Sequence, residues 1–116
     1  MKTQKIQISK IIDGGICVAA DDGKKVYDRI YDALSTGHRV TLSFYGVTRM
    51  TTAFLNAAIG QMYGDFDEDF IKAHLDAPTD FEPWHLTRLK LVTDRAKTYF
   101  RNPELVENAL KITRGE

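Results

Sequence analysis

The clearest pattern of hydrophobic and polar positions in this chain is a strand followed by a helix. Val40, Leu42 and Phe44 alternate with three residues that carry hydroxyl groups, which predicts a strand over Val40–Tyr45 with one face in the core. Beyond a connecting loop, apolar residues recur three and four positions apart, and this period predicts a helix over 52–63. The apolar positions of that helix are Phe54, Leu55, Ala58, Ile59, Met62 and Tyr63.

A shorter alternation near the N-terminus predicts an edge strand over Lys5–Ile8. Ile11 and Ile12 either extend this strand or turn away from it. The sequence Asp13-Gly-Gly15 is a turn signal. The apolar run Ile16–Ala19 that follows it predicts a second, more buried strand.

A helix is expected between this second strand and Val40–Tyr45. Asp21 or Asp22 would cap its start. It would run to about Ser35, with Gly37 just past its end. Strands separated by helices in this way predict β-α-β crossovers, and therefore a sheet with parallel pairs. The inward-facing positions of the helix are Val26, Ile30, Ala33 and Leu34.

Shorter elements are expected in the second half of the chain. Asp67 would cap a short helix through about Lys72, and His74–Ala77 would form a last short strand. The Asn-Pro pair at 102–103 restarts a helix, which would run to about Lys111.

A long helix is predicted before this last one. The segment Thr79–Glu82 has the form of a capping box, with a threonine three residues before a glutamate. Since Pro83 is tolerated only in a first turn, Asp80 is the alternative cap. The helix would reach about Phe100, with an inward stripe of Leu89, Val92, Ala96 and Tyr99.

Length and composition indicate one soluble globular domain. The 116 residues are enough to bury a stable core without disulfide bonds. Lysine plus arginine equals aspartate plus glutamate at 16 each, so the net charge is zero. Because nucleic-acid binders need a basic excess, this balance argues against DNA or RNA as a partner. The sequence also shows no membrane-spanning apolar stretch and no signal peptide, so a cytoplasmic location is expected.

No metal site, cofactor or catalytic site is expected. His38, His74 and His85 are too scattered to supply a pair of metal ligands on one helix face. Cys17 lies in an apolar run and is expected to be a core residue. No serine has a histidine partner that the sequence can place beside it, and the chain is therefore expected to be non-enzymatic.

Charge is distributed unevenly although it sums to zero. Residues 65–82 carry seven acids against Lys72 alone, whereas residues 88–101 carry five bases against Asp94 alone. Two interpretations of the basic helix stay open. It is either a solvated face that the acidic segment partly neutralises, or a docking patch for an acidic partner protein.

Two threonines stand where the helix over 52–63 begins. Thr51 or Thr52 is placed so that its hydroxyl accepts a hydrogen bond from a free N–H group of the first turn. The start of a helix also carries the positive end of the helix dipole, which favours a phosphate. Capping alone and capping combined with regulatory phosphorylation both fit this position.

Two longer segments carry a family resemblance. V-T-L-S-F-Y-G-V, residues 40–47, is similar to a strand of the form V-x-L-D-F-x-G-V, and M-T-T-A-F-L-N-A-A-I-G, residues 50–60, is similar to a helix start of the form I-T-x-x-F-x-N-A-x-I-G. Residues 16–23 and the helix after them are similar to the strand, Asp-Gly turn and first helix of the same family. The chain thereby resembles the STAS domain of bacterial anti-sigma-factor antagonists, and more closely a STAS-like family of unknown function.

The resemblance implies an α/β fold over residues 1–116 as a single domain: an about four-stranded mixed sheet with helices packed against it, plus C-terminal helices. In the antagonists, a partner kinase phosphorylates a hydroxyl at the helix start. Aligned on Met50, Thr52 falls at that acceptor position, with Thr51 beside it. Thr51 and Ser43 stand where related chains have aspartates.

The expected function is that of a non-enzymatic regulatory module in a bacterial signalling system. The resemblance implies a protein partner, an ATP-binding protein of the histidine-kinase type, whose activity the module gates by partner switching. The expected binding surface consists of Tyr45, Arg49, Thr51, Thr52 and Asn56. The alternative function is a small-ligand sensor that holds a nucleotide phosphate at the helix start. The chain itself is expected to be a monomer or a weak homodimer.

Overall fold

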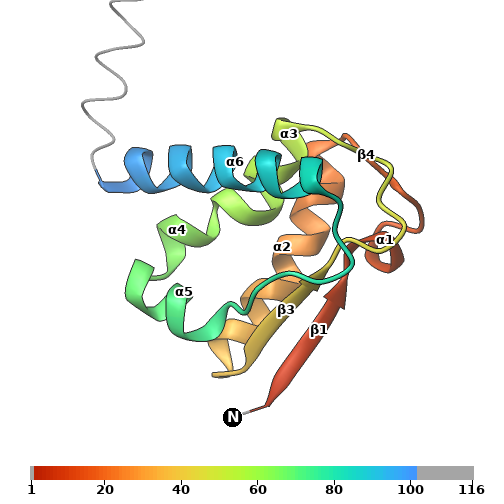
Figure 1. The fold of residues 1–116 in the computed structure, drawn as a ribbon. Helices are drawn as coiled ribbons and strands as arrows, with labels where there is room; N and C mark the ends of the chain where they lie inside the picture. Colours follow the sequence, from red (N-terminus) through yellow and green to blue (C-terminus); the bar gives the residue numbers. More distant parts are fainter. Residues whose placement is uncertain (1, 102–116) are drawn as a thin grey trace, which may run out of the picture.

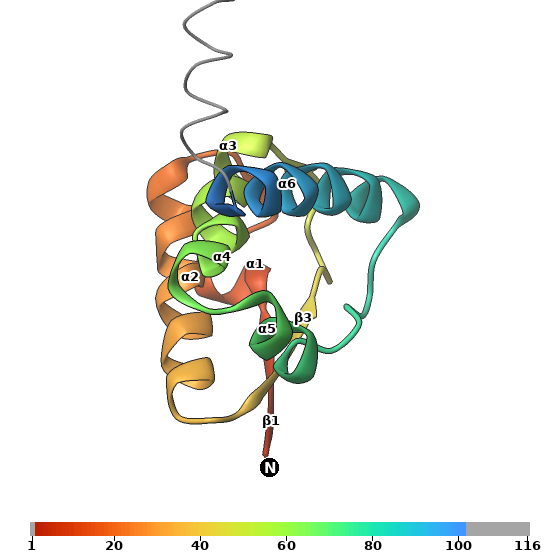
Figure 2. The same ribbon diagram turned by 90° about the vertical axis from the view of Figure 1, so that its left-hand side faces the viewer.

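The computed structural model describes residues 2–101 of the chain. Short parallel strands lie beside a larger set of helices (Figure 1). The start of β1 (Thr3–Gln7) and the helix α6 (Pro83–Arg101) lie at opposite ends of the described part of the molecule in both views (Figures 1 and 2). Within the described range, none of the helices combines the length and the apolar composition that a membrane crossing needs.

The larger sheet pairs β1 (Thr3–Gln7) in parallel with β3 (Arg39–Ser43). The edge strand expected over Lys5–Ile8 is β1, shifted toward the N-terminus. The chain then turns into α1 (Ile8–Ile11), so the isoleucines that follow the strand turn away from the sheet. The strand expected over Val40–Tyr45 ends earlier, at Ser43, but its three apolar positions are buried as the alternation predicts, with Phe44 just past the end of β3. Ser43 on the opposite face is buried too.

A second segment lies along the other side of β3. Isolated parallel bridges join Val40 to Leu75 and Ser43 to Thr79. The Thr79 amide donates to the Leu42 carbonyl oxygen at 2.9 Å. The short strand expected over His74–Ala77 is therefore reduced to a single bridge at Leu75, and the second bridge lies beyond it at Thr79.

The smaller sheet pairs β2 (Ile16–Cys17) in parallel with β4 (Arg49–Met50). The strand expected over Ile16–Ala19 is thus shorter than predicted. Of its residues only Cys17 is buried, because the chain leaves the sheet at Val18, which is exposed.

The described residues contain two two-stranded parallel sheets, so the predicted mixed sheet of about four strands was wrong in its number of joined strands and in its strand directions. The α/β class and the parallel β-α-β crossovers agree with the prediction. The difference arises because the two shorter segments pair over only two positions each.

Helix α2 (Ala20–Ser35) connects the two sheets. Ala19 occupies its N-cap position, so neither Asp21 nor Asp22 caps the helix. Both aspartates lie in the first turn, where the helix dipole stabilises a negative charge. Gly37 adopts a φ of 80° just past the end, as its position predicts. The four predicted inward positions are all buried: Val26, Ile30, Ala33 and Leu34.

The helix predicted over 52–63 is a continuous helical run with a widened turn at its centre. It consists of α3 (Thr52–Leu55), the π-helical turn η1 (Asn56–Gly60) and α4 (Met62–Asp65). The extra residue of a π turn shifts the register of the following face. Five of the six predicted inward residues are buried and Tyr63 is half-buried; the five are Phe54, Leu55, Ala58, Ile59 and Met62.

The short helix α5 (Glu68–His74) follows Asp67 at the N-cap position, although the aspartate side chain makes no capping hydrogen bond. Both caps predicted for α6 were wrong. Thr79 is engaged in the bridge to β3, and Asp80 has a φ of 55° and accepts a hydrogen bond from the Ser43 hydroxyl at 2.8 Å.

The inward stripe of α6 also differs from the prediction at its ends. Tyr99 is 39% exposed, whereas His85 is only 2% exposed and begins the stripe. Pro83 lies in the first turn, as predicted, and is the first helical residue. The final helix expected to end at about Lys111 lies outside the described residues.

Candidate functional site

Thr51 is the residue that caps the start of α3. Its hydroxyl accepts a hydrogen bond from the Phe54 amide at 3.2 Å and donates one to the Val18 carbonyl oxygen at 3.1 Å. The backbone amide of Thr51 donates to the Cys17 carbonyl oxygen at 3.0 Å. The pairing of β2 with β4 thus places the helix start beside the segment that follows β2.

Thr52 is the first residue of α3 and is half-buried. Within residues 2–101 its hydroxyl makes no side-chain hydrogen bond, in contrast to that of Thr51. Of the two threonines, Thr52 therefore has the hydroxyl that can react without loss of the cap.

A groove of about 340 Å³ opens beside the cap. Two arginines and a tryptophan give it its chemical character, and three chain segments contribute to it: the residue after β2, the segment of β4, and the first turns of α6. The groove residues are Val18, Thr48, Arg49, Met50, Thr51, Trp84 and Arg88.

Arg88 and Trp84 stand one turn apart on α6. The Arg88 guanidinium donates from Nη1 to the Met50 carbonyl oxygen at 2.6 Å, and its central carbon lies 5.7 Å from the centre of the Trp84 ring. The Trp84 indole donates from Nε1 to a Glu82 carboxylate oxygen at 2.6 Å. These contacts hold a cation and an aromatic surface on one wall of the groove.

His85 fixes this end of α6 against the loop that follows β3. Its ring nitrogen Nε2 donates to the Val47 carbonyl oxygen at 3.0 Å, and its Nδ1 accepts from the Glu82 amide at 2.9 Å. The ring also stacks on Phe44, with 5.0 Å between ring centres. This buried histidine therefore has a structural role.

The structure brings together only part of the predicted surface. Arg49 and Thr51 line the groove, whereas Thr52 lies one residue beyond it. Tyr45 is 65% exposed and Asn56 lies exposed in η1, and neither lines the groove. The sequence reasoning missed Trp84 and Arg88, although the pairing of an aromatic residue with an arginine four positions later on a predicted helix was a usable signal.

The charged segments make only limited contact. Arg101 forms two hydrogen bonds with the Glu68 carboxylate, at 2.7 and 2.5 Å, and this pair lowers the pKa of Glu68. Lys90 pairs with Asp94 of its own helix at 3.0 Å. The acidic segment therefore neutralises one end of α6, while Arg88 at the other end faces the groove.

The described residues contain no group of three histidine, cysteine or carboxylate side chains that could hold a metal ion. Cys17 is buried, and burial together with the Asp22 carboxylate raises the pKa of its thiol from 9.0 to about 11. A thiol in that state is a core residue rather than a nucleophile.

Residues 22–77 match the model of a family described as a STAS-like domain of unknown function. The match confirms the resemblance found in the sequence. It begins inside α2 and runs to just past the end of α5, so it includes Arg49 and Thr51 and ends before Trp84 and Arg88. No curated protein and no solved structure matches the chain.

Proposed function

Since the chain carries a STAS-like domain, we propose that it is a non-enzymatic regulatory module that binds a partner protein through the groove beside Thr51. The proposed partner is an ATP-binding protein of the histidine-kinase type, which the module gates by partner switching. The observation that carries the proposal is the groove itself, where Arg49 and Arg88 flank a half-buried tryptophan.

The composition of the groove suits a protein surface. Arginine and tryptophan are the side chains that most often dominate the energy of protein interfaces. Arg49 is exposed and makes no side-chain hydrogen bond or ion pair within the described residues, so it is available to an acidic group of a partner. Charges of this kind steer association and select partners.

Phosphorylation of Thr52 is the proposed switch. The Thr52 hydroxyl makes no hydrogen bond within residues 2–101, and it lies one residue from the groove. A phosphate there would add about two negative charges beside the arginines. We expect this charge to weaken the binding of an acidic partner. The helix start should stay folded, because its cap is formed by Thr51 rather than by Thr52.

The test is affinity capture of the tagged chain from its native cells, with mass spectrometry of partners and phosphorylated residues. The proposal expects an ATP-binding protein of the histidine-kinase type on the wild-type chain, retained by Arg29→Glu and lost with Arg49→Glu. Arg29 is the matched control because it is an exposed arginine on α2 that does not line the groove. Retention of the same partner by Arg49→Glu would contradict the proposed surface.

A thermal-shift measurement on the chain alone distinguishes the alternative function, a small-ligand sensor, from the proposed interaction module. A nucleotide at a hundred times its dissociation constant stabilises a protein by about 2.7 kcal/mol. The interaction module is expected to show no shift that depends on the groove residues. A shift that Arg49→Glu abolishes would favour the sensor.

A further inference from the structure

A second cavity, of about 400 Å³, lies at the far end of α6 from the groove. Three helices contribute to its walls: α4 through Tyr63, α5 through Glu68, Asp69, Ile71 and Lys72 with Leu75 just after it, and α6 through Lys97 and Arg101. Its volume is within the range of small-molecule sites, about 300 to 1,000 Å³.

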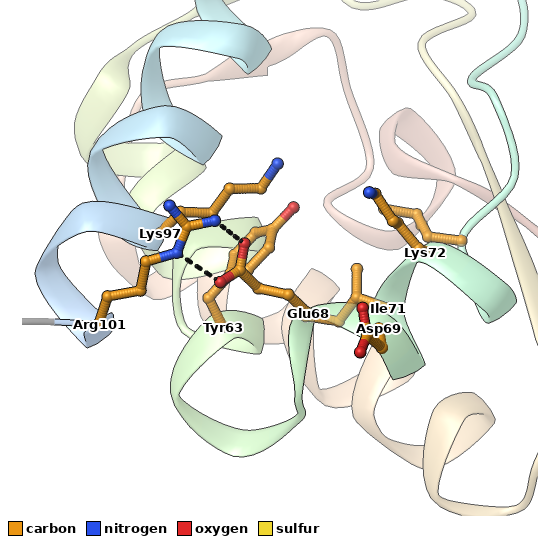
Figure 3. A pocket seen from close by; sticks show the side chains of 8 residues that line it. Tyr63, Glu68, Asp69, Ile71, Lys72, Lys97 and Arg101 are labelled. Atoms are coloured by element: carbon orange, nitrogen blue, oxygen red, sulfur yellow. Dashed lines mark hydrogen bonds and ion pairs between the residues drawn. The ribbon is translucent and has the colours of Figure 1, made fainter.

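One ion pair closes the cavity on the side of α6. Arg101 and Glu68 are joined by two hydrogen bonds, so their charges largely cancel (Figure 3). Asp69 is exposed and is the remaining carboxylate among the lining residues.

The polar groups of the cavity that can contact a ligand are two lysines and a phenol. Figure 3 shows Lys97 and Tyr63 reaching from the side of α6 and α4, with Lys72 reaching from α5 across the same space. Lys97 lies with its ammonium 5.7 Å from the centre of the Tyr63 ring. Within residues 2–101, neither lysine has an ion-pair partner and the Tyr63 hydroxyl has no hydrogen-bond partner.

All three groups can donate hydrogen bonds to a ligand. Burial, with the carboxylates of Glu68 and Asp94, raises the pKa of Tyr63, so its hydroxyl keeps its proton at neutral pH. A lysine ammonium has three donors and no acceptor. The floor of the cavity is apolar, because Ile71 is buried and Leu75 is half-buried.

From this arrangement we infer that the cavity binds a small organic dianion of the phosphate-monoester type. Its phosphate would accept from Lys72, Lys97 and the Tyr63 hydroxyl, and its apolar part would lie against Ile71 and Leu75. Two point charges suit a doubly charged head group better than a single carboxylate. This inference is independent of the proposed function, since none of these residues lines the groove beside Thr51.

The test is titration of the isotopically labelled full chain, followed by backbone amide chemical shifts. The probes are phenyl phosphate, inorganic phosphate and benzoate at about pH 7.5, where a phosphate monoester is mostly dianionic. We expect phenyl phosphate to give saturable shifts centred on residues 63, 68–75 and 97. Inorganic phosphate should bind more weakly because it lacks the apolar part, and benzoate should bind more weakly because it carries one charge.

Three variants make the test specific. Lys72→Gln combined with Lys97→Gln should weaken phenyl phosphate binding at least about tenfold, as expected for the loss of charged hydrogen bonds. Tyr63→Phe, which removes one hydroxyl, should weaken it several-fold. Lys24→Gln is the control, because Lys24 is an exposed lysine on α2 that does not line this cavity.

The inference is overturned if the shifts fail to saturate, if they spread over all surface lysines, or if the double variant binds as the wild type does. Benzoate binding as tightly as phenyl phosphate would overturn the assignment of a dianion. If the double variant does not fold, Tyr63→Phe decides, and unchanged affinity in that variant overturns the role of the hydroxyl and with it the site.

Discussion

The Nε2 of His85 donates a hydrogen bond to the carbonyl oxygen of Val47 at 3.0 Å, and this contact ties the start of α6 to the loop after β3. The other ring nitrogen accepts from the Glu82 amide, so the neutral ring with its proton on Nε2 satisfies both partners. His85 is therefore a capping residue and a tertiary link in one side chain. It holds Trp84 and Arg88 at the groove beside Arg49.

His85→Ala is expected to destabilise the fold by about 3 kcal/mol, because it removes two hydrogen bonds and leaves a cavity against Phe44. Urea unfolding measures this change. His38→Ala is the control, since His38 is only half-buried, and its cost should stay below about 1 kcal/mol. A cost for His85→Ala as small as that of the control would contradict the structural role.

Thr51→Ala is expected to lower the free energy of unfolding by about 1 kcal/mol, as the loss of an N-cap does. Thr52→Ala should have a smaller effect, because the Thr52 hydroxyl makes no hydrogen bond in the described part of the chain. Thermal unfolding of the two variants side by side checks this order. The reverse order would mean that Thr52 is the cap.

Gly23→Ala is expected to destabilise the fold by about 1 to 3 kcal/mol through overpacking. A Cβ at this position would lie 2.4 Å from the Phe54 carbonyl oxygen and 2.9 Å from the Ala57 Cβ, so α2 would have to move away from α3. Gly60→Ala is the matched control in η1, where the nearest atom to a Cβ is 3.7 Å away. Equal costs in denaturant unfolding would count against the close approach of α2 and α3.

Stability is expected to fall in alkaline solution because of Cys17. Burial raises the pKa of its thiol to about 11 in the folded state, so the folded protein holds this proton more tightly than the unfolded chain does. The thiol's contribution is complete below pH 9.0 and is lost as the pH rises to about 11, with a decline of about 2 kcal/mol.

Unfolding in urea across this pH range measures the decline, and Cys17→Ala is the comparison. The variant retains the tyrosines, so their titration contributes to both proteins equally. The wild type should lose more stability than the variant. Parallel curves for the two proteins would show that the thiol does not titrate differently in the folded state.

The sequence predicted the elements in which a periodic apolar pattern continues over several helical turns. The inward faces of α2 and of the run from α3 to α4 agree with it, because burial of one face determines each helix. It could not predict how strands join, since β2 and the bridges at residues 75 and 79 depend on pairing between distant segments. It also missed the role of Glu82 and His85 at the start of α6, because a histidine there replaces the usual glutamate of a capping box.

The sequence indicated only some of the residues that line the groove. Arg49 and Thr51 are close in sequence to the recognisable helix start, and both line the groove. Trp84 and Arg88 enter it from a helix more than thirty residues farther along the chain. Tertiary contacts of that helix bring them there, among them the hydrogen bonds of His85 with Val47 and of Arg88 with Met50. Tyr45 and Asn56 were assigned from nearness in sequence, but they lie outside the groove.

The measurement that tests the proposed surface most directly is calorimetric binding of the captured partner to three purified chains: wild type, Arg49→Glu and Arg29→Glu. Thermal midpoints of the three are recorded in parallel. If the groove is the docking surface, Arg49→Glu weakens binding at least about tenfold, about 1.4 kcal/mol, while its thermal midpoint and the affinity of Arg29→Glu stay unchanged. Equal affinities for all three chains, or a loss of binding that comes only with a loss of folding, would contradict it.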